Sequence, residues 1–73
     1  MTKNLAQAAV ARRVHLAICE AGVDAHSVAV AANITDSDLE DRLNGRAAFQ
    51  IDELVRVGGF LRTPATHFLK EAA

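Results

Sequence analysis

The sequence predicts an all-α fold: one compact domain over residues 1–73, built from five helices and no strand. Half of the residues are hydrophobic (51%), and alanine, which favours short close-packed helices over a sheet, is abundant. The apolar residues recur at helical spacing between capping residues, glycines and a proline. A chain this short buries only roughly 60% of the surface of its unfolded form, so its core has to be efficient.

A first helix is expected to begin after Asn4 and to stop at Gly22. Asn4 is a suitable N-cap with Gln7 three residues on as its capping-box partner, and glycine readily adopts the left-handed conformation that ends a helix. Arg12 and Arg13 are expected to face solvent. The core stripe of this helix consists of Val10, Val14, Ala17 and Ile18.

A short second helix is predicted over residues 25–32. Asp24 would cap its start, and Asn33 tolerates the positive φ that a tight turn after the helix requires. Ile34 is the residue of that turn that we expect to be buried. The inner face of the helix consists of Val28, Ala29 and Ala32.

A third helix is predicted over residues 36–44. Thr35 caps it, Asp38 occupies the capping-box position as a shorter substitute for glutamate, and Gly45 ends it. Its anchors to the core lie one turn apart and are Leu39 and Leu43.

A fourth helix is predicted over residues 51–60, followed by a short last helix. Gly58 and Gly59 each cost up to about 1 kcal/mol against alanine, so we expect this end of the fourth helix to be soft. Thr63 and Pro64 are a helix start, with proline at the first helical position. The apolar positions of the fourth helix are Ile51, Leu54, Val57 and Leu61. The residues that return the last helix to the core are Phe68 and Leu69.

Several classes of protein are disfavoured by composition. The single cysteine, Cys19, excludes an internal disulfide, which indicates an intracellular rather than a secreted domain. No apolar run approaches the length of a membrane span, because Arg12, Arg13 and Asp24 interrupt the longest ones, and the N-terminus lacks the pattern of a signal peptide. The sequence therefore predicts a soluble cytoplasmic protein with no membrane partner.

Two short helices joined by a turn of three or four residues with an apolar residue in it form a helix-turn-helix, here at about residues 25–44. The run 22–69 resembles the phage repressor and Cro-type (XRE-type, lambda repressor-like) helix-turn-helix domain, in the manner of small actinobacterial phage regulators. "GVDAHSVAVAANIT" takes the place of that family's Gly-Leu-Ser-Gln-x-x-Leu-Ala stretch. "LEDRLNGRAAFQIDELVRVGGFLRTPATHFL" is similar to its second half.

The resemblance implies a transcriptional regulator that reads operator DNA with the helix 36–44 lying in the major groove. With the leucines inward, helical projection turns Ser37, Asp41 and Asn44 outward. The residues expected to face the bases are Asp36, Ser37, Asp38 and Asp41. The residues expected at the DNA backbone are Ala25, His26, Ser27, Arg42, Asn44 and Arg46. For Arg42 a second interpretation is open: an ion pair with the acid one turn earlier, worth about 0.2–0.5 kcal/mol.

The charge of the recognition helix departs from the family, which usually places neutral or basic residues at the outward positions. The chain has a net charge of −1, and this helix carries Asp36, Asp38, Glu40 and Asp41. The two residues in the first turn favour the helix dipole, and aspartate can accept a hydrogen bond from cytosine N4. Carboxylates near phosphates nevertheless oppose binding. A second hypothesis is therefore a protein-interaction module of the same fold, with little DNA affinity, whose acidic helix binds a protein partner.

Neither catalysis nor a cofactor is indicated. Asp24, His26 and Ser27 crowd into one helix cap, which does not arrange a nucleophile, a base and an orienting group. His15 and Cys19 have the spacing of metal ligands on a helix, but two ligands do not make a zinc site. We therefore predict a protein that is not an enzyme and needs no metal.

A small DNA reader needs two half-sites for useful affinity, so we expect a homodimer formed through the C-terminal helices. Phe60 and Phe68 are the candidate contacts. For Phe68 the alternative, that its ring only closes the core, is equally open.

Overall fold

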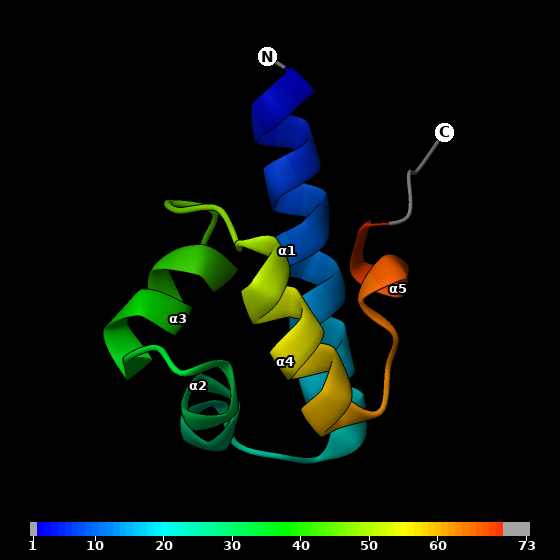
Figure 1. Ribbon diagram of the computed structural model, residues 1–73. Helices are drawn as coiled ribbons and strands as arrows, with labels where there is room; N and C mark the ends of the chain where they lie inside the picture. Colours follow the sequence, from blue (N-terminus) through cyan, green and yellow to red (C-terminus); the bar gives the residue numbers. More distant parts are fainter. Residues whose placement is uncertain (1, 70–73) are drawn as a thin grey trace.

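The computed structural model describes residues 2–69, with side chains from Gln7 onward, and has five helices and no strand over that range (Figure 1). The predicted all-α class is confirmed. The helices are α1 (Thr2–Ala21), α2 (Ala25–Ala32), α3 (Asp36–Leu43), α4 (Ile51–Leu61) and α5 (Ala65–Leu69). The long α1 forms the centre of the molecule, with α4 in front of it and α3 and α5 on either side.

The start and one flank of α1 differ from the prediction. The helix begins at Thr2, so Asn4 lies inside it and does not cap it, because the alanine-rich segment continues the helix backwards. The amide of Gln7 instead donates a hydrogen bond to the carbonyl of Gly45, at 3.1 Å. Arg13 does not face solvent freely: its Nη1 donates to the Phe68 carbonyl at 3.3 Å and ties α1 to α5. The stop at Gly22 is confirmed by its φ of 71°.

Within the described residues, no single helix is both long and apolar enough to span a membrane. Residues 7–21 and 25–32 reach that length and composition only together, and the chain bends by 119° between them.

Nine apolar residues drawn from all five helices form the core. They are Val14, Ile18, Val28, Ala29, Ala32, Leu39, Leu54, Val57 and Phe68. The Phe68 ring is fully buried, so it closes the core as one of the two sequence interpretations held. Ile34 and Leu43 are partly buried against this cluster.

Two predicted core positions are wrong. Ile51, the first residue of α4, is 62% exposed, because the inner side of that turn is taken by Glu53, which is only 6% exposed. Leu69 is 41% exposed at the end of the five-residue α5, beyond the elements against which Phe68 packs.

Gly58 and Gly59, which both weaken the end of α4 through their low helix propensity, have different environments. Gly58 is buried, and a Cβ added to it would collide with the carbonyl oxygen of Thr63 and lie 3.3 Å from the nitrogen of Ala65. The Thr63 amide donates to the Gly58 carbonyl at 2.8 Å. A Cβ on Gly59 would meet nothing within 4 Å. Gly58 therefore allows the turn into α5, which begins one residue after Pro64, to fold back tightly onto α4.

Alanine substitutions at the two glycines are expected to have opposite effects on stability. Gly58→Ala should lower the free energy of unfolding by about 1–3 kcal/mol, because the new methyl group displaces backbone atoms of the α4–α5 turn. Gly59→Ala, the matched control, should raise it by about 0.5–1 kcal/mol through helix propensity. Urea denaturation followed by circular dichroism measures both. If both substitutions changed the free energy of unfolding equally, the close approach of the Thr63 carbonyl would not restrict position 58 to glycine.

Candidate nucleic-acid interface

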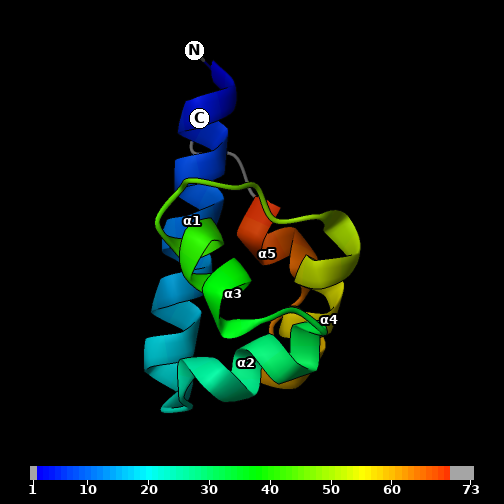
Figure 2. The same cartoon turned by 90° about the vertical axis from the view of Figure 1, so that its left-hand side faces the viewer.

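The connection between α2 and α3 is short and fixed by hydrogen bonds (Figure 2). Asn33 adopts the left-handed conformation, with φ 63°, and its amide donates to the Val30 carbonyl at 3.1 Å. Thr35 then caps α3, since its Oγ1 accepts from the Asp38 amide at 3.0 Å. Both roles were predicted, and together they set two eight-residue helices at a sharp turn to each other.

The two sides of α3 differ as helical projection predicts. Leu39 is buried and Leu43 is partly buried, so this side anchors α3 to the core. The exposed residues of α3 and its C-cap are Asp36, Ser37, Asp38, Glu40 and Asn44. Asp41 is partly exposed. The base-facing candidates therefore lie at or near the surface of one helix.

At the other side of the turn, His26 on α2 contacts Asp36 on α3. The Nδ1 atom of His26 lies 2.9 and 3.0 Å from the two carboxylate oxygens, and both side chains are about two-thirds exposed (68% and 66%). The hydrogen bond to Asp36, followed by the charge of that carboxylate, raises the pKa of His26 above its ordinary value of 6.5. A protonated His26 thus neutralises the first acid of α3.

The remaining residues at the start of α2 were also candidates for the DNA backbone. Ala25 is exposed and offers only its main chain. The hydroxyl of Ser27 donates to Asp24 Oδ1 at 2.8 Å, and this bond is the main cause of the lowered pKa of Asp24. Asp24 stands at the N-cap as predicted, but its side chain bonds this hydroxyl instead of capping the helix directly.

The pKa of His26 is expected to fall toward 6.5 in an Asp36→Asn variant, because the carboxylate that favours the imidazolium is removed. Because the pKa of His26 is higher in the folded chain than in the unfolded chain, the pair contributes its full stabilisation at a pH below the pKa of His26 in the unfolded chain. That contribution is lost as the pH rises through the folded pKa. An NMR titration of the His26 ring protons in both proteins measures the shift. An unchanged pKa in the variant would contradict the pairing of His26 with Asp36.

Arg42 makes contacts that neither sequence interpretation anticipated. Its Nε and Nη2 donate to the two carboxylate oxygens of Glu53, at 2.8 and 3.1 Å, and both side chains are nearly buried (14% and 8% exposed). Its Nη1 donates to the backbone carbonyl of Asp38, not to the carboxylate, at 3.1 Å. Glu53 Oε1 also accepts from the Gln50 amide at 3.0 Å. The guanidinium thus joins α3 to the start of α4 and is turned away from solvent.

Glu53 is the residue that sequence reasoning missed. The available signal was its position three residues after Gln50, where a capping-box glutamate stands; the structure has this box. That signal indicates a helix start and does not point to an arginine on another helix.

Arg46 pairs with Asp41 on the exposed side. Its Nε and Nη2 lie 3.2 and 3.1 Å from Asp41 Oδ1, with the side chains 63% and 44% exposed. The Arg46 amide also donates to the Asp41 carbonyl, at 2.8 Å. The ion pairs among the described residues therefore include Asp36 and Asp41 but not the carboxylates of Asp38 and Glu40.

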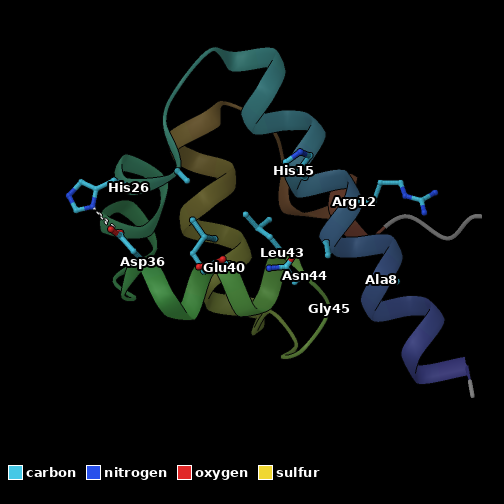
Figure 3. A pocket seen from close by; sticks show the side chains of 12 residues that line it. Ala8, Arg12, His15, His26, Asp36, Glu40, Leu43, Asn44 and Gly45 are labelled. Atoms are coloured by element: carbon cyan, nitrogen blue, oxygen red, sulfur yellow. Dashed lines mark hydrogen bonds and ion pairs between the residues drawn. The ribbon is translucent and has the colours of Figure 1, made fainter.

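A groove of about 750 Å³ runs between α1 and α3 (Figure 3). Arg12 and His15 come from α1 and Glu40 from α3, on its two sides, and the His26–Asp36 pair closes one end. Its apolar lining consists of Ala8, Ala11, Ala25, Leu39 and Leu43.

His15 also lies 3.8 Å from the sulfur of Cys19, from Nε2 to Sγ. Within the described part of the chain, no group of three or more histidine, cysteine or acidic side chains is arranged to hold a metal ion.

These features define the class of the protein: a compact five-helix all-α domain in which two short helices, α2 and α3, are joined by a tight turn and α3 exposes an acidic side. No protein-family model, curated protein or solved structure matches the chain.

Proposed function

We propose that the protein is a DNA-binding transcriptional regulator of the phage repressor and Cro type, and that α3 reads operator DNA from the major groove. The observation that carries the proposal is the α2–turn–α3 unit. Leu39 and Leu43 hold α3 against the core while the opposite side is exposed from Asp36 to Asn44. A helix that is anchored to the core on one side and exposed to solvent on the other meets the geometric requirement for docking in the major groove. Such a regulator acts by binding in the cytoplasm, without catalysis or a cofactor.

In this proposal Ser37, Asp38 and Asp41 face the bases, with Asp36 at the edge of the contact. The backbone contacts come from both ends of the unit: Ala25 and His26 at the start of α2, and Asn44 and Arg46 after α3. Arg42 acts indirectly, since its guanidinium is bound to Glu53 and positions α3.

The acidic surface is compatible with DNA binding because two of its carboxylates are already partnered. Asp36 has His26 and Asp41 has Arg46. The exposed pair of Arg46 with Asp41 contributes only about 0–1 kcal/mol, so Arg46 can contact a phosphate beside Asp41, and the local charge of the two side chains stays close to zero.

Fluorescence anisotropy with labelled duplex DNA from the protein's own regulatory region tests the function. With about three phosphates neutralised per copy, affinity should fall about 40-fold between about 50 and 200 mM salt. A control duplex of scrambled sequence should bind more weakly at both salt concentrations. Absence of binding even at the lower concentration would contradict the proposal.

A second candidate function, a module that binds a basic protein partner through α3, is favoured by one observation. The carboxylates of Asp38 and Glu40 have no ion-pair partner among the described residues, while Arg42 is withdrawn from the surface. The exposed side of α3 therefore has an excess of negative charge. In that case the natural protein shows no DNA affinity at low salt, and Asp41→Arg creates it.

A further inference from the structure

His15 and Cys19 are arranged as a chelating pair on the outer side of α1. Both side chains are exposed, and Nε2 of His15 lies 3.8 Å from Sγ of Cys19. In a tetrahedral zinc site with a Zn–S distance of about 2.3 Å and a Zn–N distance of about 2.1 Å, a sulfur and a nitrogen ligand lie about 3.6 Å apart. The pair is therefore close to the separation that a tetrahedral zinc ion requires, and small rotations of the two side chains close the difference.

The helix fixes this spacing. Residues at positions i and i+4 lie on the same face of a helix, which is a common placement of two zinc ligands. The opposite side of α1 is anchored, because Val14 and Ile18 belong to the core. The backbone of the pair is thus ordered before an ion binds, and the ion is not needed to fold the chain.

Two ligands from one chain do not complete a zinc site, since a structural site takes four. Within the described residues, no third histidine, cysteine or acidic side chain joins the pair in a group that could hold a metal ion. A second copy of the chain offers an identical pair, and a two-fold axis through the ion places the two pairs on opposite sides of it. Leu16, on the same face of α1, is 53% exposed and becomes covered in such a contact.

We propose that His15 and Cys19 of two copies of the chain together bind one zinc ion and join the two α1 helices face to face. Each thiol releases one proton to solvent as its sulfur binds, and each imidazole binds in its neutral form. Two thiolates then balance the charge of the ion. This contact lies on α1, away from the C-terminal helices, and the inference does not depend on DNA binding.

Titration of the full, reduced chain with cobalt(II), followed by absorption, tests the site. Cobalt(II) accepts the same tetrahedral ligands as zinc, and a thiolate ligand gives it a charge-transfer band. We expect saturation at one ion for each pair of chains, displacement by zinc, and tighter binding as the pH rises, because two protons leave. His15→Ala and Cys19→Ser should each weaken zinc binding at least about 100-fold, since each removes two of the four ligands. His67→Ala removes an exposed histidine of α5 and is the matched control, which should bind like the natural protein.

Sedimentation equilibrium with zinc and with EDTA tests the part played by the second copy. Zinc should raise the average molar mass of the natural protein and EDTA should reverse the rise, whereas His15→Ala and Cys19→Ser should not respond. Far-UV circular dichroism confirms that the variants are folded. Zinc bound without a rise in molar mass would overturn the shared site. So would unchanged affinity in Cys19→Ser, or a loss of binding in His26→Ala in place of His15→Ala.

Discussion

Replacement of Arg42 by methionine is expected to lower the free energy of unfolding by about 3–5 kcal/mol, a large part of the stability of a domain this small. The variant leaves the Glu53 carboxylate, 8% exposed, without its cation, and it removes the hydrogen bond to the Asp38 carbonyl. Because the methionine side chain fills the space of the aliphatic part of the arginine, the loss of stability measures mainly the cost of burying the Glu53 carboxylate without a cation. Urea denaturation followed by circular dichroism measures it.

The double variant Arg42→Met/Glu53→Leu is expected to recover most of that loss. Its stability should lie within about 2 kcal/mol of the natural protein, because a buried ion pair exchanged for apolar side chains of similar size is close to neutral. The exposed pair supplies the control: Arg56→Ala should change stability by about 0.5 kcal/mol or less. If Arg42→Met cost no more than Arg56→Ala, Arg42 and Glu53 would not form the structural link assigned to them.

This ion pair also matters for the proposed recognition helix. It is the side-chain bridge from α3 to the start of α4, and Arg42 binds both helices at once through Asp38 and Glu53. We expect the double variant, although folded, to bind DNA less tightly than the natural protein, because two apolar side chains do not fix the rotation of α3 as a bidentate pair does.

The features predictable from the sequence are those that depend on neighbours within one turn. The bounds of α2 match the prediction, and those of α3 and α4 differ from it by one residue. Asn33 and Thr35 specify the turn between α2 and α3 through bonds to residues at most four positions away. The outward positions of α3 follow from the same local periodicity, so the candidate DNA-facing set was accessible from the sequence.

The features that sequence reasoning missed depend on contacts between elements. Arg42 has acids at several spacings, and only the fold, which brings the start of α4 within reach of the Arg42 guanidinium, selects Glu53, eleven positions away. The role of Gly58 depends on where the backbone of Thr63 returns. Asp41 and Arg46 meet because Gly45, with φ 78°, reverses the chain between them. Helical periodicity contains none of this information.

Reversal of the charge at Arg46 is expected to have the largest effect on DNA binding. Arg46→Glu should weaken binding to the operator duplex at least about 100-fold at low salt. It removes the cation that pairs with Asp41 on α3, adds an acid, and leaves Asp41 without that partner. The control Arg62→Glu makes the same charge change in the exposed turn after α4 and should weaken binding only a few-fold. Anisotropy titrations of both variants in the same salt series provide the comparison.

Asp38 and Glu40, the acids of α3 without an ion-pair partner among the described residues, should then respond differently to neutralisation. The comparison shows whether either carboxylate contacts a base or only repels the phosphates. Glu40 borders the groove toward α1, so Glu40→Gln should raise affinity for every DNA sequence by a similar factor. Asp38 stands in the first turn, where a carboxylate can accept from cytosine, so Asp38→Asn should change the preference at one base pair by about 1–3 kcal/mol. If both substitutions raise affinity uniformly, α3 binds DNA without reading it through Asp38. If the natural protein and both variants fail to bind DNA, the proposed reading of DNA by α3 is wrong.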